Sequence, residues 1–337
     1  MIEKSQALLP DSVNIHPVLN EDFELLLPLL RGRVMRSHTL PKAVKLLLIS
    51  CLLGFMILLP FSYAQGPMNI QELEHILGTK GNLQAGVWVA SFPRSDLKVA
   101  IEGVPVPPAF GFGSWTAWKE TGQGMMVMGD LVLLEKEITP VIPALADSGI
   151  QITAIHNHLI GEQPRVMYMH IHGSGPASRL AQGIRRALDQ TATPPPLSSP
   201  GSPVPPAPAL ETKRLEEIIR HPGQSAGGVF KIIVGRPGVK AQGMELTAAM
   251  GMNSWIGMIG TEERAHAIGD IAMLGPEVNP VIQTLRRHGI KVVALHNHML
   301  DEDPRIFFLH YWGTGSPQNL AQAFRDALDQ LNAPSSR

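Results

Sequence analysis

The sequence predicts an α+β protein made of two tandem copies of one small domain, each with an antiparallel or mixed sheet and helices on one face. The first observation is an internal repeat, because residues 152–175 align without a gap to residues 292–315. The second is the succession of apolar patterns in each copy, where helix-like segments flank strand-like ones. The third is the segment 191–210, whose proline, serine and alanine are typical of a linker.

Local signals place the elements within the first copy. Helical spacing of apolar residues predicts a helix at 70–77 and another that begins at Gly175-Pro176. Thr139-Pro140 is typical of a helix start, and Gly149 of its end. Extended apolar runs predict strands at 86–92, 97–104, 125–134, 151–159 and 165–172. The second copy repeats the helix signals at Asn279-Pro280, Gly289 and Ser316-Pro317.

The repeat and the linker together divide the chain. We expect one repeat domain at 69–190, the linker at 191–210 and a second repeat domain at 211–332. The linker is too rich in proline to fold and should behave as a semi-stiff spacer. The two sheets are expected to pack against each other as a pseudo-dimer.

One long apolar run lies near the start of the sequence, at residues 46–61. Lys42 and Lys45 precede it, and Ser62-Tyr63-Ala64 follows it. A basic flank, an apolar stretch shorter than the ~20 residues that span a bilayer, and a small-residue exit are typical of a signal peptide. We therefore expect cleavage after Ala64 and export to the periplasm, the cell envelope or the outside of the cell.

Met35 is the expected start of this signal. A signal peptide at 35–64 has an ordinary length, so residues 1–34 are interpreted as an untranslated or cytosolic extension. The alternatives are an uncleaved anchor and a lipoprotein signal at Cys51, and both rank below cleavage after Ala64. In each case, contact with a membrane is expected only through this segment.

Charge and cysteine content exclude several classes of partner and site. The 28 basic residues nearly balance the 29 acidic ones, so no global field favours nucleic acid. Cys51 is the only cysteine, and cleavage after Ala64 removes it, which excludes disulfides and cysteine–zinc sites from the mature chain. The expected partner is an unidentified small molecule or a ligand of the envelope.

Histidines on two successive predicted strands carry the strongest chemical signal. His156 and His158 form one i, i+2 pair, and His170 and His172 form another. Alternation along a strand puts both members of a pair on one face of the sheet. The two pairs share that face if His156 lies opposite Tyr168, and they separate if the register slips by one residue. A shared face would make a cluster suited to zinc or another divalent transition metal.

The second copy keeps three of these four histidines. They are His296, His298 and His310, while Trp312 stands in place of His172. A site with three histidines leaves an open position, which is the arrangement that catalytic metals use. The alternative is that the rings hydrogen bond to backbone or carboxylate groups and fill a polar niche. Recurrence of the pattern in both copies brings these two interpretations close to parity.

The histidines belong to a longer motif, HNH–x5–PR–x4–H–x2–G–x–G, that occurs in both copies. In the first copy it comprises His156-Asn157-His158, Pro164-Arg165, His170, Gly173 and Gly175, and in the second His296-Asn297-His298, Pro304-Arg305, His310, Gly313 and Gly315. This motif resembles the LppY/LpqO family of domains of unknown function. The resemblance implies an envelope or secreted setting and brings no known reaction or ligand.

Charged residues near the motif are further candidates. Asp130 and Asp270 follow glycine at matching places and could be metal ligands, second-shell partners of a histidine, or turn residues. Arg165 and Arg305 are expected to pair with these two aspartates rather than to bind an anion. The loop glutamates at 162 and 302 are expected to be solvated.

Two other patterns receive less weight. Gly173-Ser174-Gly175 could be an anion-binding strand–turn–helix, although a plain turn is the better interpretation. Ser114, with a histidine and an aspartate, could form a catalytic triad, but the sequence has no G-x-S-x-G elbow.

Two functional hypotheses follow. The first is an exported metal-binding envelope protein, in its strongest form a metal-dependent hydrolase, with His156, His158 and His170 as ligands. In it, His172 is a fourth ligand or a general base, and Asp130 supports a ligand from the second shell. The second hypothesis is a non-catalytic binding or structural module of the envelope.

The processing prediction is tested by N-terminal sequencing of the exported protein. The mature chain should begin at Gln65, because the small-residue exit ends at Ala64. A mature form that begins at a lipid-bearing Cys51 would show that the two signals were ranked wrongly.

Overall fold

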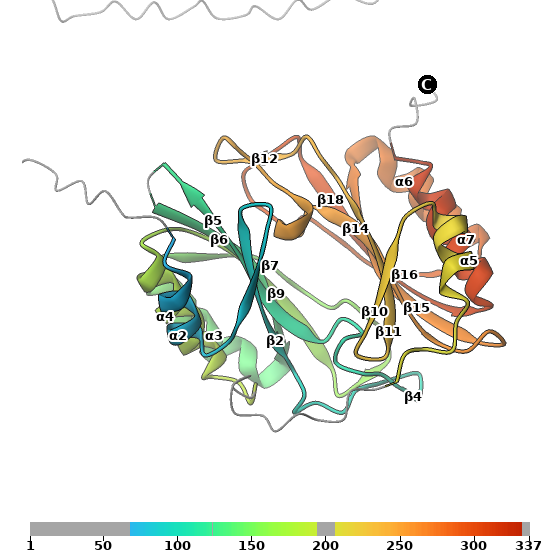
Figure 1. Ribbon diagram of the computed structural model, residues 1–337, viewed down its shortest axis with the longest axis horizontal. Coiled ribbons are helices and arrows are strands. Elements are labelled where there is room, and N and C mark those ends of the chain that lie inside the picture. The colour runs from blue at the N-terminus through green and yellow to red at the C-terminus, as the bar shows by residue number, and fades with distance from the viewer. Residues whose placement is uncertain (1–67, 123, 194–205, 332–337) are drawn as a thin grey trace, which may run out of the picture. The chain divides into compact units, whose positions relative to one another are not determined.

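Each copy contains one six-stranded antiparallel sheet with helices on one of its faces (Figure 1). The computed structural model describes residues 68–122, 124–193 and 206–331, so the predicted signal peptide and most of the linker lie outside the described residues. In sheet order, the strands of the first copy are β1 (Gly81–Gln84), β2 (Val87–Pro93), β5 (Gly113–Thr121), β6 (Gly124–Leu134), β9 (Val166–Gly175) and β7 (Ile150–His156). Those of the second are β10 (Gly223–Ala226), β11 (Val229–Gly235), β14 (Asn253–Gly260), β15 (Ala265–Leu274), β18 (Ile306–Gly315) and β16 (Lys291–His296).

Three helices accompany each sheet. They are α2 (Ile70–Leu77), α3 (Glu135–Ala146) and α4 (Ala177–Leu188) in the first copy, and α5 (Thr212–Ile219), α6 (Val278–Arg287) and α7 (Pro317–Leu328) in the second. The matching strand orders confirm the predicted α+β class and its duplication. Within the described ranges, none of the helices is long and apolar enough to cross a membrane.

A small three-stranded sheet beside each large one holds the loop that follows the HNH segment. In the first copy it consists of β4 (Val104–Pro105), β3 (Ala100–Ile101) and β8 (Glu162–Gln163), and in the second of β13 (Met244–Glu245), β12 (Lys240–Ala241) and β17 (Glu302–Asp303). The strand predicted at 97–104 is therefore wrong. Glu102 and Gly103 adopt positive φ values of 50° and 83°, which turn the chain into a short hairpin.

Helix α3 begins earlier than the Thr139-Pro140 signal predicted. The Glu137 side chain accepts a hydrogen bond from the backbone N–H of Leu134 at 2.8 Å, which caps the helix and leaves Pro140 inside it. In the second copy a 3-10 turn (Gly275–Glu277) precedes α6, so Pro280 lies in the first turn of the helix. The capping glutamate thus sets both helix starts, and proline does not.

Each large sheet packs its helices through an apolar layer of its own. In the first copy this layer contains Trp88, Trp118, Leu180 and Ile184, among others. Apolar residues of α5, α6 and α7 form the corresponding layer of the second copy, together with side chains of its sheet. The end of the predicted linker joins this second layer, since Leu210 packs against it and Ala209 bridges Thr261.

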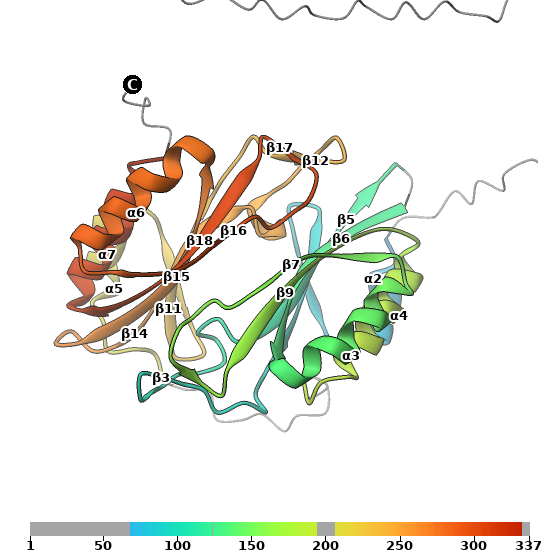
Figure 2. The same cartoon turned by 180° about the vertical axis from the view of Figure 1, so that it is seen from behind.

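The faces without helices bring the two copies together. One apolar cluster combines Met126 and Met128 of the first copy with Met299 and Phe308 of the second. Another combines residues of both copies around Tyr168 and Trp312, and the Thr153 hydroxyl donates to the His298 carbonyl at 2.7 Å. The expected pseudo-dimer of two sheets is therefore present within one chain, as Figures 1 and 2 show from opposite sides.

Each copy contains a buried ion pair between an arginine and a glutamate. The fully buried guanidinium of Arg94 donates to Glu137 at 2.7 and 3.1 Å and to Asp96 at 2.8 and 2.9 Å. In the second copy Arg236 binds Glu277 at 2.9 and 3.0 Å. Each arginine thus ties the end of the second strand to the glutamate that caps α3 or α6.

Replacing Arg94 should destabilise the protein strongly. Arg94→Met leaves Glu137 buried without its cation, so the free energy of unfolding should fall by about 3–5 kcal/mol in urea titrations. Arg165→Met is the control, because Arg165 and Glu135 are exposed and 3.7 Å apart, and it should change stability by less than about 0.5 kcal/mol. Equal effects of the two variants would contradict a structural role for the buried pair.

Candidate metal centre

The strand register places the histidines of each HNH motif and the histidine of the next strand on one face of the sheet. His156 pairs with Tyr168, and a bulge between Ile152 and Ala154 then sets Ala154 opposite His170. The second copy has the same bulge and places His296 opposite Phe308. Of the two registers left open by the sequence, the structure has the one in which the histidines share a face.

Six histidines, three from each copy, form a single cluster between the copies. Their rings stack across the boundary in three pairs: His156 with His296 at a centroid distance of 3.6 Å, His158 with His310 at 3.7 Å, and His170 with His298 at 3.6 Å. Equivalent residues of the two copies are 140 positions apart. The equivalents of His158 and His310 are therefore His298 and His170, while His156 and His296 are each other's equivalents. The sequence led us to expect one histidine cluster in each copy, and the structure brings both sets into one cluster, because both copies direct the same face at each other.

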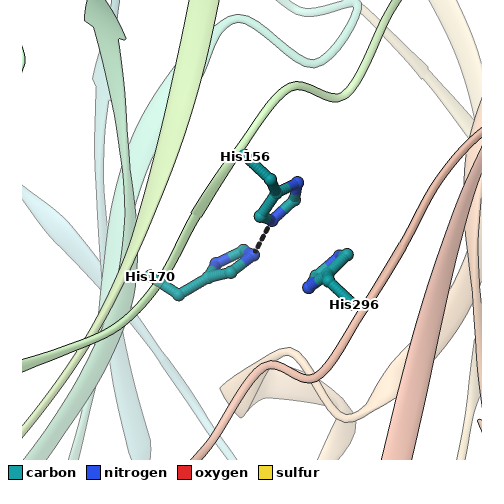
Figure 3. Close-up of side chains that lie close together, drawn as sticks. All are labelled: His156, His170 and His296. Atoms are coloured by element: carbon teal, nitrogen blue, oxygen red, sulfur yellow. Dashed lines mark hydrogen bonds between the residues drawn. The ribbon is translucent and has the colours of Figure 1, made fainter.

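Within each copy, two of the rings meet through their Nε2 atoms. His156 Nε2 lies 2.7 Å from His170 Nε2, and His296 Nε2 lies 3.0 Å from His310 Nε2. Figure 3 shows His156 and His170 joined in this way, with His296 approaching from the other copy. One ligand atom from each of these three residues lies within 4.8 Å of the others, which is close enough for one ion.

The outer nitrogens of these rings face acceptors. His156 Nδ1 lies 3.1 Å from the Asn157 carbonyl, and the same distance separates His296 Nδ1 from the Asn297 carbonyl. A carbonyl oxygen only accepts, so Nδ1 carries the proton in both rings and Nε2 keeps its lone pair. The asparagine of each HNH segment therefore fixes the tautomer of the histidine before it.

The asparagine side chains stabilise the turn that follows. Asn157 Nδ2 donates to the Leu159 carbonyl at 2.6 Å, and Asn297 Nδ2 donates to the Met299 carbonyl at 2.8 Å. These bonds hold the chain just beyond the strand that carries His156 or His296. These bonds explain in structural terms why asparagine is the middle residue of the HNH motif.

The two aspartates lie behind the remaining rings. Asp130 Oδ1 is 2.5 Å from His170 Nδ1, whereas Asp270 Oδ1 is 3.9 Å from His310 Nδ1. Asp130 is therefore close enough to orient the His170 ring from behind, and it also belongs to a group of possible ligands with His158 and His170. The copies differ here, since Asp270 is farther from its histidine.

Burial keeps the cluster uncharged. Desolvation, aided by the neighbouring imidazoles, lowers the pKa of His296 to about 2 and that of His298 to about 3. The same causes hold the pKa of His158, His170 and His310 well below the usual value. Desolvation raises the pKa of Asp130 to about 6. At neutral pH the cluster consequently offers neutral rings with free lone pairs, the form of histidine that binds metals.

His172 lies outside the cluster that the sequence assigned to it. None of the three groups of possible ligands among the described residues includes it, and its register neighbours are Met128 and Gln151. Its place is taken in the second copy by Trp312, which packs edge-on against Phe110. His172 therefore stands outside the groups of possible ligands, and its role as a general base stays a prediction.

The charged residues of the hairpin loops behave differently from the expectation. Arg165 approaches Glu135, and Arg305 lies 3.3 Å from Glu302, so neither arginine pairs with an aspartate of the cluster. Glu162 and Glu302 are buried rather than solvated. They accept hydrogen bonds from the N–H groups of Val166 and Ile306 at 3.3 and 3.2 Å, which closes each loop onto the strand after it.

The serine and glycine candidates have structural roles. Ser114 Oγ accepts from the Val132 N–H at 2.9 Å, and Ser254 Oγ accepts from the Ala272 N–H at 3.0 Å. Gly173-Ser174-Gly175 continues strand β9, and Ser174 bonds to Gln242, so this segment is not an anion-binding turn. Within the part of the chain that the structure describes, Ser114 makes no hydrogen bond to a histidine.

Two features of the site were not predicted. The Tyr168 ring stacks on His158 at a centroid distance of 3.3 Å. In the second copy only, the Lys231 ammonium lies 4.0 Å from the centre of the Trp255 ring, and desolvation lowers its pKa to about 8. An isolated lysine in an otherwise apolar strand pattern was the available signal for the second feature.

A separate cavity of about 440 Å³ lies between the copies. Glu102 and Ile160 line it from the first copy, and Arg286, Lys291 and Trp312 line it from the second. Glu102 pairs with Lys291 and accepts from the Trp312 indole at 3.3 Å. None of the six clustered histidines contributes to its lining.

Comparison with known proteins gives a family and little else. The sequence matches the family described as Domain of Unknown Function (DUF1259) at residues 71–190 and again at 213–330. No curated protein matches the chain.

Two solved structures show a low level of likeness. One is the trimeric bacterial microcompartment shell protein PduB, with 13% identity, a TM-score of 0.20, and coverage of 75% of this chain and 90% of that chain. The other is a double-ringed trimeric shell protein from the RMM microcompartment, with 13% identity, a TM-score of 0.16, and coverage of 66% and 84%. At these scores the likeness supports no conclusion about this chain.

The metal-free protein should lose stability as the pH falls below about 6.5. An imidazole in the unfolded chain takes up a proton near that pH, whereas the buried rings stay neutral to much lower pH. The unfolded state then binds more protons, so each such ring lowers the free energy of unfolding by up to about 1.4 kcal/mol per pH unit. Urea titrations between about pH 7 and about pH 5 measure this slope. His298→Gln should reduce it, and an unchanged slope would contradict the neutral state of that ring.

Proposed function

This chain belongs to the DUF1259 family of domains of unknown function, and we propose that it is an exported metal-binding protein whose two copies share one divalent transition-metal ion. The observation that carries the proposal is the convergence of Nε2 atoms from both copies, in rings whose outer nitrogens already face acceptors. The ligands are His156, His170 and His296. The fourth is His310, whose Nε2 lies 3.0 Å from that of His296.

The donor set fits such an ion. Two nitrogens bound to one tetrahedral zinc at 2.0–2.1 Å lie about 3.3 Å apart. The Nε2 pairs of the protein are 2.7 and 3.0 Å apart, so small ring rotations would reach that spacing. Imidazole ligands suit zinc, copper and nickel, and the site offers no soft thiolate. Carbonyl and carboxylate groups behind the rings supply the support that metal-binding histidines usually have.

Sharing the ion couples metal binding to the packing of the two copies. Ligands from β7 and β9 would be joined through the ion to a ligand at the end of β16. Because the ion binds only when both sheets are in place, its binding free energy stabilises their contact. A shared ion with a structural role would combine the two hypotheses, since the protein would then be both metal-binding and non-catalytic.

A metal-dependent hydrolase is the second candidate, and one observation favours it. The group of possible ligands formed by His156, His170 and His296 does not include His310. If only His156, His170 and His296 bind the ion, a fourth position stays available for water, which a bound zinc ion would acidify. Hydrolysis would then require His310 to remain unbound.

Export is part of the proposal and is supported by sequence alone. The basic, apolar and small-residue segments that end at Ala64 are typical of a cleaved signal peptide. The resemblance of the HNH motif to the LppY/LpqO family supports the same envelope setting. Such a location exposes the site to metal ions of the periplasm or the medium.

The shared site can be tested by adding one equivalent of Zn²⁺ to the protein and measuring how much is retained. The mature protein, expressed without a histidine tag, should retain that equivalent through dialysis, as measured by mass spectrometry of the metal. His156→Ala and His296→Ala should each reduce retention at least tenfold, because either change removes a ligand of the same ion. His172→Ala is the matched control and should retain the wild-type amount.

The variants separate the alternatives. Two independent sites predict that His296→Ala leaves an ion on the first copy that is lost when His156 is also replaced, and this result would contradict the shared centre. A wild-type protein that retains no metal would overturn the proposal and leave the binding module as the interpretation of the histidine cluster.

A further inference from the structure

We propose that a second divalent transition-metal ion binds beside the shared one, in the first copy only, between Asp130, His158 and His170. The inference rests on the proposed shared centre and extends it to a two-metal site. One ligand atom from each of these three residues lies within 4.8 Å of the others. Carboxylate and imidazole together are a donor set that zinc and copper accept.

Three buried polar atoms point to this site because they lack hydrogen-bond partners. They are Oδ1 of Asp130, Nε2 of His158 and Nδ1 of His170. The Asp130 and His170 residues are 8% and 1% exposed, so water does not replace the missing partners from the surface. Buried polar groups in native proteins are nearly always paired, and three unpaired atoms in one place indicate a missing ligand. A cation satisfies all three at once.

The close contact between Asp130 and His170 is not a hydrogen bond, and a modest separation of the two side chains would admit an ion, since two ligands of one zinc ion lie about 3.3 Å apart. Their Oδ1 and Nδ1 atoms are 2.5 Å apart, and neither is hydrogen-bonded. An ion between them would take the place of the Nδ1 proton, which passes to solvent. His170 would then bridge the two ions, with Nε2 on the shared ion and Nδ1 on the second. The charge of the bridging imidazolate is offset by the two dications.

The second copy differs from the first near the corresponding aspartate. Lys231 occupies the strand position that Val89 occupies in the first copy, where the register pairs them with Gly257 and Ala117 respectively. The Lys231 ammonium lies over the Trp255 ring and is attracted by Asp270. Asp270 Oδ1 also lacks a hydrogen-bond partner, but no nitrogen of His298 or His310 does, and no group of possible ligands among the described residues includes Asp270. This difference confines the second ion to the first copy.

The number of ions that each chain binds can be measured by loading the protein with copper. With excess Cu²⁺ followed by dialysis, the wild-type chain should retain two ions, and Asp130→Asn and His158→Ala should each retain one. Asp270→Asn is the matched control from the other copy and should retain two. Exchange coupling through the bridging imidazolate should lower the electron paramagnetic resonance signal per bound copper in the wild type. Asp130→Asn should restore the full signal of an isolated Cu²⁺ ion.

The outcomes distinguish this inference from the proposed function. Retention of one ion by the wild type and by all three variants would overturn the second site and leave the shared site standing. Retention of none by the wild type would overturn both. Equal losses in Asp130→Asn and Asp270→Asn, with circular dichroism showing folded proteins, would overturn the restriction to the first copy. A full copper signal in a wild type that binds two ions would overturn the bridging role of His170.

Discussion

The contact between the two helix-free sheet faces is the constraint on which the rest of the structure depends. Each sheet buries one face under its helices, and the other face is too apolar to remain in water. Because the copies are similar in sequence, the same face of each meets its counterpart, and residues at equivalent positions approach one another across the contact. The histidine cluster is a consequence of that approach: His156 and His296 stack because they are equivalent residues.

The same contact creates an electrostatic problem that a bound metal ion would resolve. Apolar clusters to either side remove the rings from water, and desolvation keeps them neutral. Neutral imidazoles packed with Nε2 against Nε2 form a hydrogen bond only if one ring carries its proton on Nε2, which leaves the Nδ1 of that ring without a proton. A divalent cation accepts several lone pairs at once and needs no proton from the rings. The packing that would make a metal-free cluster costly therefore also shapes it for an ion.

Sequence reasoning recovered the parts of the fold that local patterns determine. The repeat, the helix Ile70–Leu77 and the strand Gly124–Leu134 follow from spacing and apolar runs, and so does the last helix of each copy. The start of α3 was predicted wrongly because the Glu137 cap outweighs the proline signal. Glu162 was expected in solvent, since nothing local reveals that its carboxylate closes a loop onto Val166.

The residues of the candidate site could be predicted from the sequence, but their arrangement in space could not. Spacing identified the histidines, but the register depends on a bulge between Ile152 and Ala154 that has no local signature. Pairing across the copies is a tertiary property, so the sequence assigned His172 to a site that its strand position does not reach. The difference between Val89 and Lys231 was visible in the alignment of the copies. Its meaning required the ring of Trp255 beneath the ammonium.

Duplication explains why the two halves of the site are no longer equivalent. Two identical chains related by a two-fold axis must change both halves together, whereas tandem copies in one chain can change each half alone. The chain has used this freedom around the shared face: Trp312 replaces His172, Gln242 replaces Glu102, and Lys231 replaces Val89. The residues that line the shared centre stay the same in both copies, while those one step away differ. A common centre with unequal surroundings is what one chain can build and a symmetric dimer cannot.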